Sequence, residues 1–560
     1  MPTDRLSMEA FKTTSVSEFE TNAAFPRLDA SEVAAAAAVG RIERIAAGTT
    51  IIRTGEGPAN CYIVATGAID IIDRSSPTER LVTTHNPGGF TGDMGLLAGW
   101  PALTDARAVV DSEVVRLDAT QLRHLLLVHP PIGEKWISAM IRRRAYLLSG
   151  GVEGLHIFGR ADDSATLRIS EFLYRNGIPH LWRNVAADDA QAELARIHPE
   201  GRPALPAVSL GSSMLLTAPS LEDLARVTGV LHPIPTGCFD VVIVGAGPAG
   251  LGAAVYAASE GLHTLIVDPL GPGGQAGSSS RIENYAGFPE GISGRDLALR
   301  AYMQALKFGA VFAVPRSVAS LDSGGDGKHT IVLSDGALVA ARAVIVSTGV
   351  SYRHFQVPGL AELAGVGVYY AATQMEAIRC RNRPVHIIGA GNSAGQAAMY
   401  LSQFTDQVNL VVRGKDIHSS MSDYLADRVV SNPSVKLRLS SELRKVSGAQ
   451  SLETVTIEET QSCIQSEETS GGVFVFIGAI PATGFLGMNV ARNPEGFIFT
   501  GANIPPGAWT RTDRQPLPLE TSVPGLLAAG DCRVASTKRV AFAIGDGALA
   551  VTCLHELFGT

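Results

Sequence analysis

Closely paired cysteines are absent from this sequence of 560 residues. The six cysteines are scattered, and no two of them form a Cys-x-x-Cys pair; they are Cys61, Cys238, Cys380, Cys463, Cys532 and Cys553. Metal sites and dithiol redox centres use that spacing, whereas a disulfide framework needs a dense set of cysteines. The sequence therefore predicts neither a metal site nor a disulfide framework, and it favours the cytoplasm as the compartment.

Positive charge and long apolar runs are also scarce. The formal net charge is −8 at pH 7, so a basic footprint for nucleic acid is missing. No segment reaches the ~20 apolar residues that a membrane span needs, and the N-terminus does not resemble a signal peptide. We expect neither nucleic acid nor a membrane as partner. The length predicts several domains, and 46% hydrophobic residues suit a multidomain α/β protein with buried parallel sheets.

One stretch carries a dinucleotide-binding fingerprint. Residues 239–250 read FDVVIVGAGPAG, and a helical pattern and a second apolar run then lead to Asp268. This order of strand, glycine turn, helix, strand and acid is specific. Gly245 permits the turn, Gly247 lets the backbone approach a pyrophosphate, and Gly250 permits close helix packing. Asp268 suits a ribose hydroxyl.

Several later stretches extend this site. Residues 272–275 (PGGQ) and 281–284 (RIEN) form a loop suited to wrapping a flavin, and residues 347–349 (STG) end another apolar strand. Asp531 follows a further strand, where it suits ribityl hydroxyls. A helix from about Arg539 directs its positive N-terminus at the flavin. The predicted FAD residues are Gly245, Gly247, Pro248, Ala249, Gly250, Asp268, Gly274, Gln275, Asn284, Thr348, Gly349, Gly530, Asp531, Arg539, Val540 and Ala541.

A second fingerprint lies in RPVHIIGAGNSAGQ, residues 383–396. The strand that follows ends in Arg413 and Lys415 rather than an acid, which favours the extra phosphate of NADPH, although NADH stays possible. The predicted nicotinamide-nucleotide residues are Gly389, Gly391, Asn392, Ser393, Ala394 and Arg413.

The N-terminal part has a different pattern. After a leader (1–24), residues 25–148 contain short strands separated by glycines, a glycine-rich segment and C-terminal helices, and they resemble a cyclic-nucleotide-binding domain, a β-barrel of the jelly-roll type. In that family a glycine–glutamate pair and an arginine hold the ligand. Gly92 is present and Asp93 stands in for the glutamate, but Ala102 stands at the arginine position. The resemblance therefore makes cyclic nucleotide binding doubtful and favours an interaction module.

Residues 153–230 resemble a small thioredoxin-like α/β domain. Pro206 stands where that family has a cis-proline, but residues 160–166, where its cysteines would lie, contain none. The domain is therefore expected to lack thiol chemistry.

The motifs GAGPAG, PGGQ, STG, GAGNSA, IPATG and AAGD, in this order, resemble thioredoxin reductase of the low-molecular-weight type. The resemblance implies two Rossmann-like domains, FAD-binding (237–353 and 479–560) and NAD(P)-binding (354–478), and a homodimer. The family's redox cysteines, however, are replaced by Ala372 and Met375. Glu376 matches the family's acid and is a candidate acid–base residue.

This departure predicts an FAD oxidoreductase, reduced by NAD(P)H, that does not reduce thioredoxin, because disulfide exchange needs an attacking and a resolving thiol. The acceptor would be oxygen, a small molecule or a redox protein. Two alternatives stay open: a flavin-dependent oxidase or dehydrogenase of a small metabolite, and a non-catalytic flavin-binding sensor of redox state or ligand.

Overall fold

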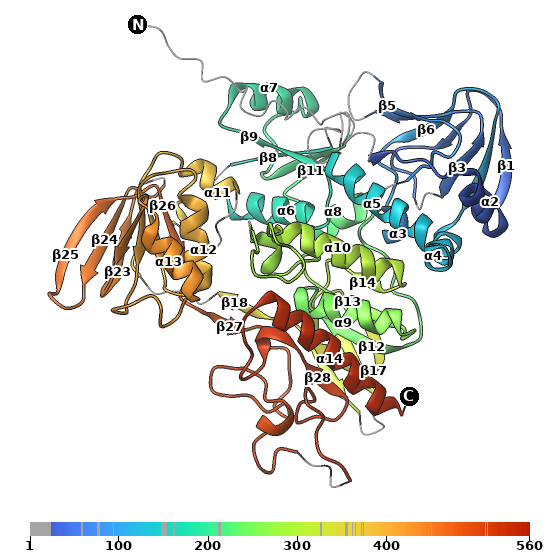
Figure 1. The fold of residues 1–560 in the computed structure, drawn as a ribbon. Helices are drawn as coiled ribbons and strands as arrows, with labels where there is room; N and C mark the ends of the chain where they lie inside the picture. Colours follow the sequence, from blue (N-terminus) through green and yellow to red (C-terminus); the bar gives the residue numbers. More distant parts are fainter. Residues whose placement is uncertain are drawn as a thin grey trace, which may run out of the picture. The chain divides into compact units, whose positions relative to one another are not determined.

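Figure 1 shows the fold in a computed structural model. The described residues are 24–559, with gaps at 58–59, 75–78, 93–94, 147–153, 161–162, 211–213, 280, 325–327, 353–356, 361, 364–365, 371, 373, 450, 510 and 512. The chain divides into two compact units. The first comprises Met1–Phe158, Ser170–Ile234 and Tyr302–Pro315, and the second comprises Gly159–Ile169, Pro235–Ala301 and Arg316–Thr560.

The first unit begins with two antiparallel sheets, ordered β1-β7-β3 and β2-β6-β4-β5. Along the described part of the sequence, one helix precedes the strands and two follow them. The pattern of short strands separated by glycines predicts these strands. Closure of these sheets into a barrel stays a prediction. The elements are α2 (Ala30–Val39), β1 (Arg41–Ile45), β2 (Thr50–Ile52), β3 (Cys61–Thr66), β4 (Ile69–Asp73), β5 (Arg80–His85), α3 (Gly95–Ala98), β6 (Asp105–Ala108), β7 (Ser112–Leu117), α4 (Ala119–Val128) and α5 (Pro130–Tyr146).

A third sheet follows, ordered β11-β10-β8-β9, with β10 antiparallel to both of its neighbours. The peptide bond before Pro206 is cis. The elements are β8 (Leu155–Gly159), α6 (Ser164–Arg175), β9 (His180–Asn184), α7 (Asp188–Ile197), β10 (Ala207–Leu210), β11 (Met214–Thr217) and α8 (Leu221–Val227).

β12 is a central strand of the first Rossmann-like sheet. It pairs in parallel with β13 and β17, and β17 also pairs in parallel with β28 and antiparallel with β16. The strand is buried on both faces, which explains its apolar, β-branched run. The elements are β12 (Cys238–Val244), α9 (Pro248–Ser259), β13 (Thr264–Val267), α10 (Gly294–Lys307), β14 (Val311–Ala313), β15 (Val318–Ser323), β16 (His329–Leu333), β17 (Leu338–Val346), β28 (Leu526–Ala528) and α14 (Val540–Phe558).

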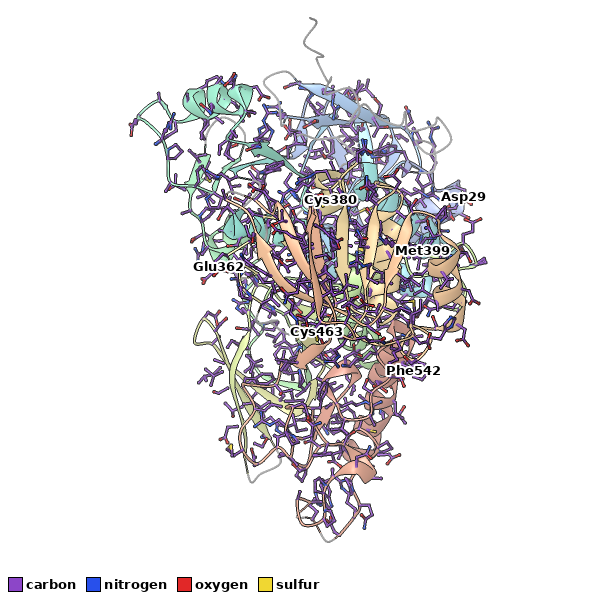
Figure 2. The ribbon with its side chains drawn as sticks, turned by 90° about the vertical axis from the view of Figure 1, so that its left-hand side faces the viewer. Asp29, Glu362, Cys380, Met399, Cys463 and Phe542 are labelled. Carbon is purple, nitrogen blue, oxygen red and sulfur yellow. The ribbon has the colours of Figure 1, made fainter. Side chains whose placement is uncertain are left out.

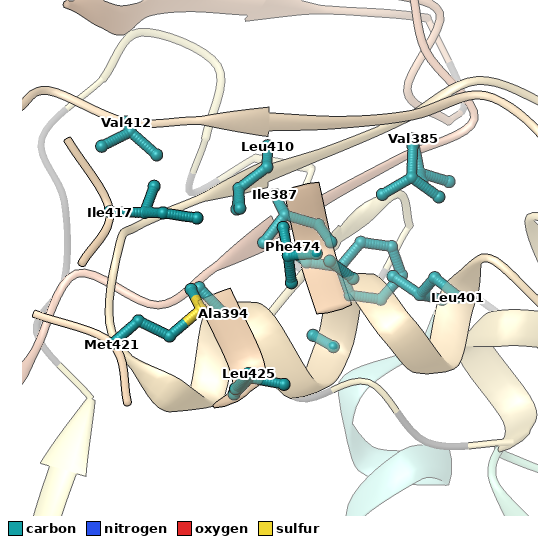
Figure 3. Close-up of a cluster of buried hydrophobic side chains, with 14 of the residues drawn as sticks. Val385, Ile387, Ala394, Leu401, Leu410, Val412, Ile417, Met421, Leu425 and Phe474 are labelled. Atoms are coloured by element: carbon teal, nitrogen blue, oxygen red, sulfur yellow. The ribbon is translucent and has the colours of Figure 1, made fainter. Parts of the chain in front are cut away.

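The second Rossmann-like sheet is ordered β19-β26-β20-β21-β22, and a three-stranded sheet, β23-β24-β25, accompanies it. Its core packs side chains of β20 and β21 against α12 and α13 (Figure 3). The elements are β19 (Val368–Tyr369), α11 (Gln374–Arg379), β20 (Val385–Ile388), α12 (Asn392–Leu401), β21 (Val408–Val411), α13 (Asp423–Ser431), β22 (Val435–Arg438), β23 (Ser441–Ser447), β24 (Thr454–Glu459), β25 (Ile464–Thr469) and β26 (Gly472–Val475).

The two Rossmann-like parts are joined by an antiparallel ribbon of β18 (Val350–Tyr352) and β27 (Ala479–Pro481). The predicted border at residues 353–354 follows β18 directly, and the border at 478–479 precedes β27 directly. The chain thus leaves and re-enters the FAD-binding part at one place.

Helices α9 and α14 approach each other closely because glycines face the contact. A Cβ atom on Gly547 would lie 2.2 Å from the carbonyl oxygen of Ala249, and one on Gly252 would lie 2.8 Å from that of Ile544. Real Cβ atoms do not approach this closely, so larger residues would force the helices apart.

We predict that Gly547→Ala destabilises the protein, whereas Gly545→Ala on the same helix does not. A Cβ on Gly545 meets nothing within 4 Å, so this control gains roughly 0.5–1 kcal/mol from helix propensity. Overpacking at Gly547 costs roughly 1–3 kcal/mol. Thermal unfolding followed by circular dichroism should show a lower Tm for Gly547→Ala alone. Equal Tm values for both variants would contradict the packing role.

Candidate functional site

A cavity of about 280 Å³ lies in the second unit, at the carboxyl ends of β12 and β17. Both fingerprints contribute to its wall. The predicted residues that line it are Gly245, Gly247, Pro248, Ala249, Asp268, Gly274, Gln275, Asn284, Thr348, Gly349, Asp531, Arg539 and Val540 from the FAD set, and Asn392 and Ser393 from the nicotinamide set. The lining does not include Gly250, Gly530, Ala541, Gly389, Gly391, Ala394, Arg413 or Glu376.

The first glycine turn is tight enough to exclude side chains. Gly245 has φ +105°, and a Cβ on Gly250 would lie 1.8 Å from the carbonyl oxygen of Gly245. Gly250 therefore serves the packing of α9 on its strand. A Cβ on Gly274 would lie 2.8 Å from the Cα of Gly247, so the PGGQ loop also comes close to the start of α9. The floor of the cavity at Gly247 and Gly274 therefore has to be formed by backbone without side chains.

Asp268 has a second role besides the predicted ribose contact. Its buried carboxylate accepts hydrogen bonds from the backbone N–H groups of Ala246, at 2.8 Å, and of Leu270 and Gly271, at 2.9 and 2.8 Å. These bonds tie the first glycine turn to the loop after β13.

Two side-chain oxygens at the cavity lack the partners that burial normally demands. The Thr348 hydroxyl and the Asp531 Oδ1 atom are buried, and neither finds a hydrogen-bond partner within the described part of the chain. Burial raises the pKa of the Asp531 carboxyl, while Lys538 opposes the rise. Leaving such groups unpaired costs roughly 1–3 kcal/mol each. Both would be satisfied by a polar ligand, and ribityl hydroxyl groups of FAD fit this requirement.

The turn after β28 is fixed to α14. Asp546 on α14 accepts a hydrogen bond from the backbone N–H of Gly530 at 3.0 Å and two from the Arg533 guanidinium at 2.7 Å each. Bidentate pairs of this kind are geometrically specific. They hold Asp531 and the N-terminus of α14, where Arg539 and Val540 line the cavity, in one arrangement.

Residues of the nicotinamide fingerprint have structural roles in this part of the chain. The Asn392 amide oxygen accepts from the N–H of Ser422 at 2.7 Å and so joins the starts of α12 and α13. Ala394 is buried in the domain core, as Figure 3 shows. Gly389 has φ +143° and needs its hydrogen, because a Cβ there would lie 2.3 Å from the carbonyl oxygen of Phe476. Arg413 is exposed just beyond β21.

Ala372 lines the cavity at the position of the family's first redox cysteine. Met375, at the position of the second redox cysteine, lies in α11. Glu376 is in the first turn of α11 and does not line the cavity; its acid–base role stays a prediction.

The cysteines nearest in sequence to the cavity residues have unreactive thiols. Cys380, labelled in Figure 2, and Cys532 are both fully buried, and neither lines the cavity. Burial raises the pKa of each thiol to about 12, so neither forms a thiolate at neutral pH. The Cys532 thiol donates to the carbonyl oxygens of Val346 and Ala529, at 3.4 Å each. The described wall of the cavity thus contains no cysteine.

Several lining residues were not selected from the sequence. They include the cations Arg281 and Lys538, the polar residues Ser278, Ser279 and Gln396, and the aromatic Phe476. Arg281 belongs to the RIEN stretch, of which only Asn284 was chosen, and Lys538 adjoins Arg539. Both cations lie within or beside a motif already assigned to the FAD site, and this proximity was the signal by which they could have been found.

The glycine-rich segment of the first unit has alanine, Ala102, at the position where the cyclic-nucleotide-binding family has its arginine. Ala102 and Leu103 line a separate cavity there, together with Gly92. Arg107, on β6, does not line it and instead pairs with Glu79 at 3.4 Å. Asp93 lies outside the described residues. Cyclic nucleotide binding by the family's contacts therefore stays doubtful.

Comparisons with known proteins agree with this organisation. A family model described as pyridine nucleotide-disulphide oxidoreductase matches residues 239–547, and one described as cyclic nucleotide-binding domain matches residues 42–129. The chain is 34% identical to a thioredoxin reductase of Treponema pallidum (strain Nichols) over 312 residues, 56% of this chain and 94% of that protein. It is 33% identical to a thioredoxin reductase of Bacillus subtilis (strain 168) over 320 residues, with coverage of 57% and 94%.

Solved structures show the same relation. The crystal structure of T. acidophilum thioredoxin reductase aligns with a TM-score of 0.52 at 28% identity, covering 57% of this chain and 99% of that one. The Lactococcus lactis thioredoxin reductase aligns with a TM-score of 0.51 at 26% identity, covering 57% and 98%.

We predict that Asp531→Ala weakens FAD binding, because the flavin loses the carboxylate that would accept its hydroxyl groups. A hydrogen bond to a charged group is worth about 1.5–3 kcal/mol, which corresponds to a loss of affinity of roughly ten- to a hundredfold. The ratio of flavin to protein absorbance after purification measures this loss. Asp322→Ala, at an exposed position of β15, is the matched control. Full FAD occupancy in Asp531→Ala would refute the assignment.

Proposed function

The chain belongs to the pyridine nucleotide-disulphide oxidoreductase family, and from this premise we propose an FAD enzyme that is reduced by NADPH and passes electrons to an acceptor other than a protein disulfide. The cofactors of this family and of its thioredoxin reductases are FAD and NADPH. The relatives carry the name thioredoxin reductase, so the acceptor is where this chain would differ from them.

A single observation carries the proposal: the cavity wall has alanine, Ala372, where a dithiol would have to meet the flavin. Disulfide reduction by the family's route requires a thiolate and a resolving thiol. The buried cysteines nearest in sequence, Cys380 and Cys532, supply neither. Without a disulfide in the way, a small acceptor can approach the flavin directly.

The cavity residues have the following proposed roles. When bound, FAD supplies hydride and electron transfer. The glycine floor at Gly247 and Gly274 admits its pyrophosphate, and Thr348 and Asp531 bind its ribityl hydroxyls. The N-terminus of α14 directs a positive partial charge at the ring. Asn392 and Ser393 line the same cavity from the nicotinamide side, and Arg413 is assigned to the extra phosphate of NADPH.

Residues 153–230 are proposed to form a thioredoxin-like domain without thiol chemistry. The sheet order β11-β10-β8-β9 supports this fold. At the position of the family's cysteines, Asp163 caps α6 by accepting from the N–H and hydroxyl of Thr166, at 2.9 and 2.6 Å.

The first test is anaerobic mixing of the purified protein with NADPH in a stopped-flow spectrometer, repeated with NADH. We predict rapid loss of flavin absorbance, followed in air by oxygen consumption or by reduction of added quinones. Oxidised thioredoxin should not be reduced. A flavin that stays oxidised with both nucleotides would contradict NADPH dependence and favour the metabolite oxidase or the sensor.

A variant isolates the role of the missing dithiol. Ala372→Cys combined with Met375→Cys restores the family's pair and should show thiols that titrate on NADPH addition, whereas the natural chain should not. If the natural chain reduces thioredoxin as fast as it reduces oxygen, the proposed acceptor class is wrong.

We also propose a cytoplasmic homodimer that associates through α9 and α14. Among the described residues, α14 is the one helix long and apolar enough to cross a membrane, and 39% of its apolar window is buried against the rest of the unit. Phe542, labelled in Figure 2, and Leu549 lie seven residues apart on one face, 59% and 40% exposed, and Tyr256 of α9 is 46% exposed. A second copy of the chain would cover these side chains.

Leu549→Asp should therefore weaken association. A charge buried in an interface without a partner costs several kcal/mol, so the dimer dissociation constant should rise by at least about tenfold. Size-exclusion chromatography with light scattering measures the mass. Tyr424→Asp, at an exposed position of α13 that is 42% accessible, is the control. An unchanged dimer in Leu549→Asp would place the interface elsewhere.

A further inference from the structure

The loop that runs from Asp531 to α14 is held by a second segment of the same unit. The backbone N–H of Ile498 donates to the carbonyl oxygen of Cys532 at 3.0 Å, and the N–H of Val534 donates to that of Ile498 at 2.8 Å. Ile498 is fully buried. These contacts fix residues 497–499 beside the turn that carries Asp531.

Phe497, which precedes Ile498, is presented by a hydrogen-bonded turn. The N–H of Phe497 donates to the side-chain oxygen of Asn493 at 2.8 Å, and the N–H of Asn493 donates to the carbonyl oxygen of Phe497 at 2.9 Å. Gly496 has φ +94°, and its N–H donates to the carbonyl oxygen of Asn493 at 2.9 Å. The backbone on both sides of the half-buried Phe497 ring is thus fixed.

A cation of the cavity wall lies at this ring. The ammonium nitrogen of Lys538 lies 5.0 Å from the centre of the Phe497 ring, which is within the range of a cation–π interaction. Lys538 is exposed, and it lines the cavity of the second unit. An exposed lysine has many rotamers available, so the contact with the ring restricts the position of its charge.

The charge of Lys538 acts on the part of the cavity that is assigned to FAD. Burial raises the pKa of the Asp531 carboxyl, and among the charges that act on this carboxyl Lys538 has the largest effect, in the opposite direction. The buried Oδ1 atom of Asp531 is one of the two oxygens that ribityl hydroxyl groups would satisfy. Charges are screened less in a partly buried site than in water. A flavin bound at Asp531 is therefore within the influence of the Lys538 ammonium group.

We propose that Lys538 stabilises the reduced form of the bound flavin and that Phe497 positions it for this role. The inference rests on the proposed function, because it requires FAD in the cavity. Reduction adds negative charge to the flavin ring, so a nearby cation favours the reduced form and raises the reduction potential. A higher potential favours oxygen or quinones as acceptors over the low-potential disulfide of thioredoxin.

The experiment measures the two-electron reduction potential of the flavin in the full-length, FAD-loaded protein, by photoreduction beside a reference dye. Lys538→Met should weaken the binding of reduced FAD relative to oxidised FAD by about tenfold, which lowers the potential by about 30 mV. Lys538→Arg keeps the positive charge and should restore the potential of the natural chain. Lys445→Met, at an exposed position of β23, is the matched control and should leave the potential unchanged.

A second variant covers the possibility that Lys538→Met loses its FAD. Phe497→Leu keeps the lysine but removes the ring that holds it, and it should lower the potential by a smaller amount. The proposal is overturned if neither variant lowers the potential, if Lys538→Arg lowers it as much as Lys538→Met, or if Lys445→Met has the same effect. Photoreduction does not use the nucleotide, so a flavin that NADPH leaves oxidised refutes the proposed function alone.

Discussion

The close approach of bare backbone at the first glycine turn is the constraint on which the larger site depends. Gly245 needs its positive φ, and Gly250 lets α9 start directly against the strand that precedes it. The same helix then meets α14 through Gly547. Since α14 also carries Asp546, which fixes the turn at Gly530, the floor and one wall of the cavity belong to a single packed assembly. Substitution of one glycine in this assembly would shift the wall together with the floor.

Polar groups at the cavity follow two opposite patterns. Asp268 is fully engaged with backbone amides, and it holds the shape of the turn. Asp531 and Thr348 instead present buried oxygen atoms without partners in the described chain. A carboxylate that accepts hydrogen bonds from its own chain stabilises the fold. A buried carboxylate oxygen without a partner destabilises it, and a polar ligand that donates a hydrogen bond to that oxygen removes this cost on binding. The two acids that the sequence assigns to the same cofactor are therefore physically distinct.

Sequence reasoning succeeded where a motif determines local backbone geometry. The turn at Gly245 and the starts of α9 and α12 follow from glycine and apolar patterns that act over a few residues. It did not find Lys538 or Phe476 at the cavity, because their placement depends on the path of loops and on packing between distant segments. Arg143 is the extreme case: it lies 51 residues from Gly92, the glycine that its Nη1 atom contacts. No local pattern in a helix identifies which of its arginines will be buried.

Both cavities keep the backbone frame of a known family but change the side chain that performs the family's chemistry. In the larger cavity, alanine replaces a reactive thiol, and the remaining thiols nearby are buried and protonated. In the smaller cavity, alanine replaces the ligand-binding arginine, and another arginine enters from α5. Backbone cradles depend on glycine and on strand order, which side-chain substitutions leave intact. A family's fold can therefore persist when a side chain used in its reaction is replaced, and this is why the proposed change of acceptor is argued from the side chains that line the cavity and not from the fold.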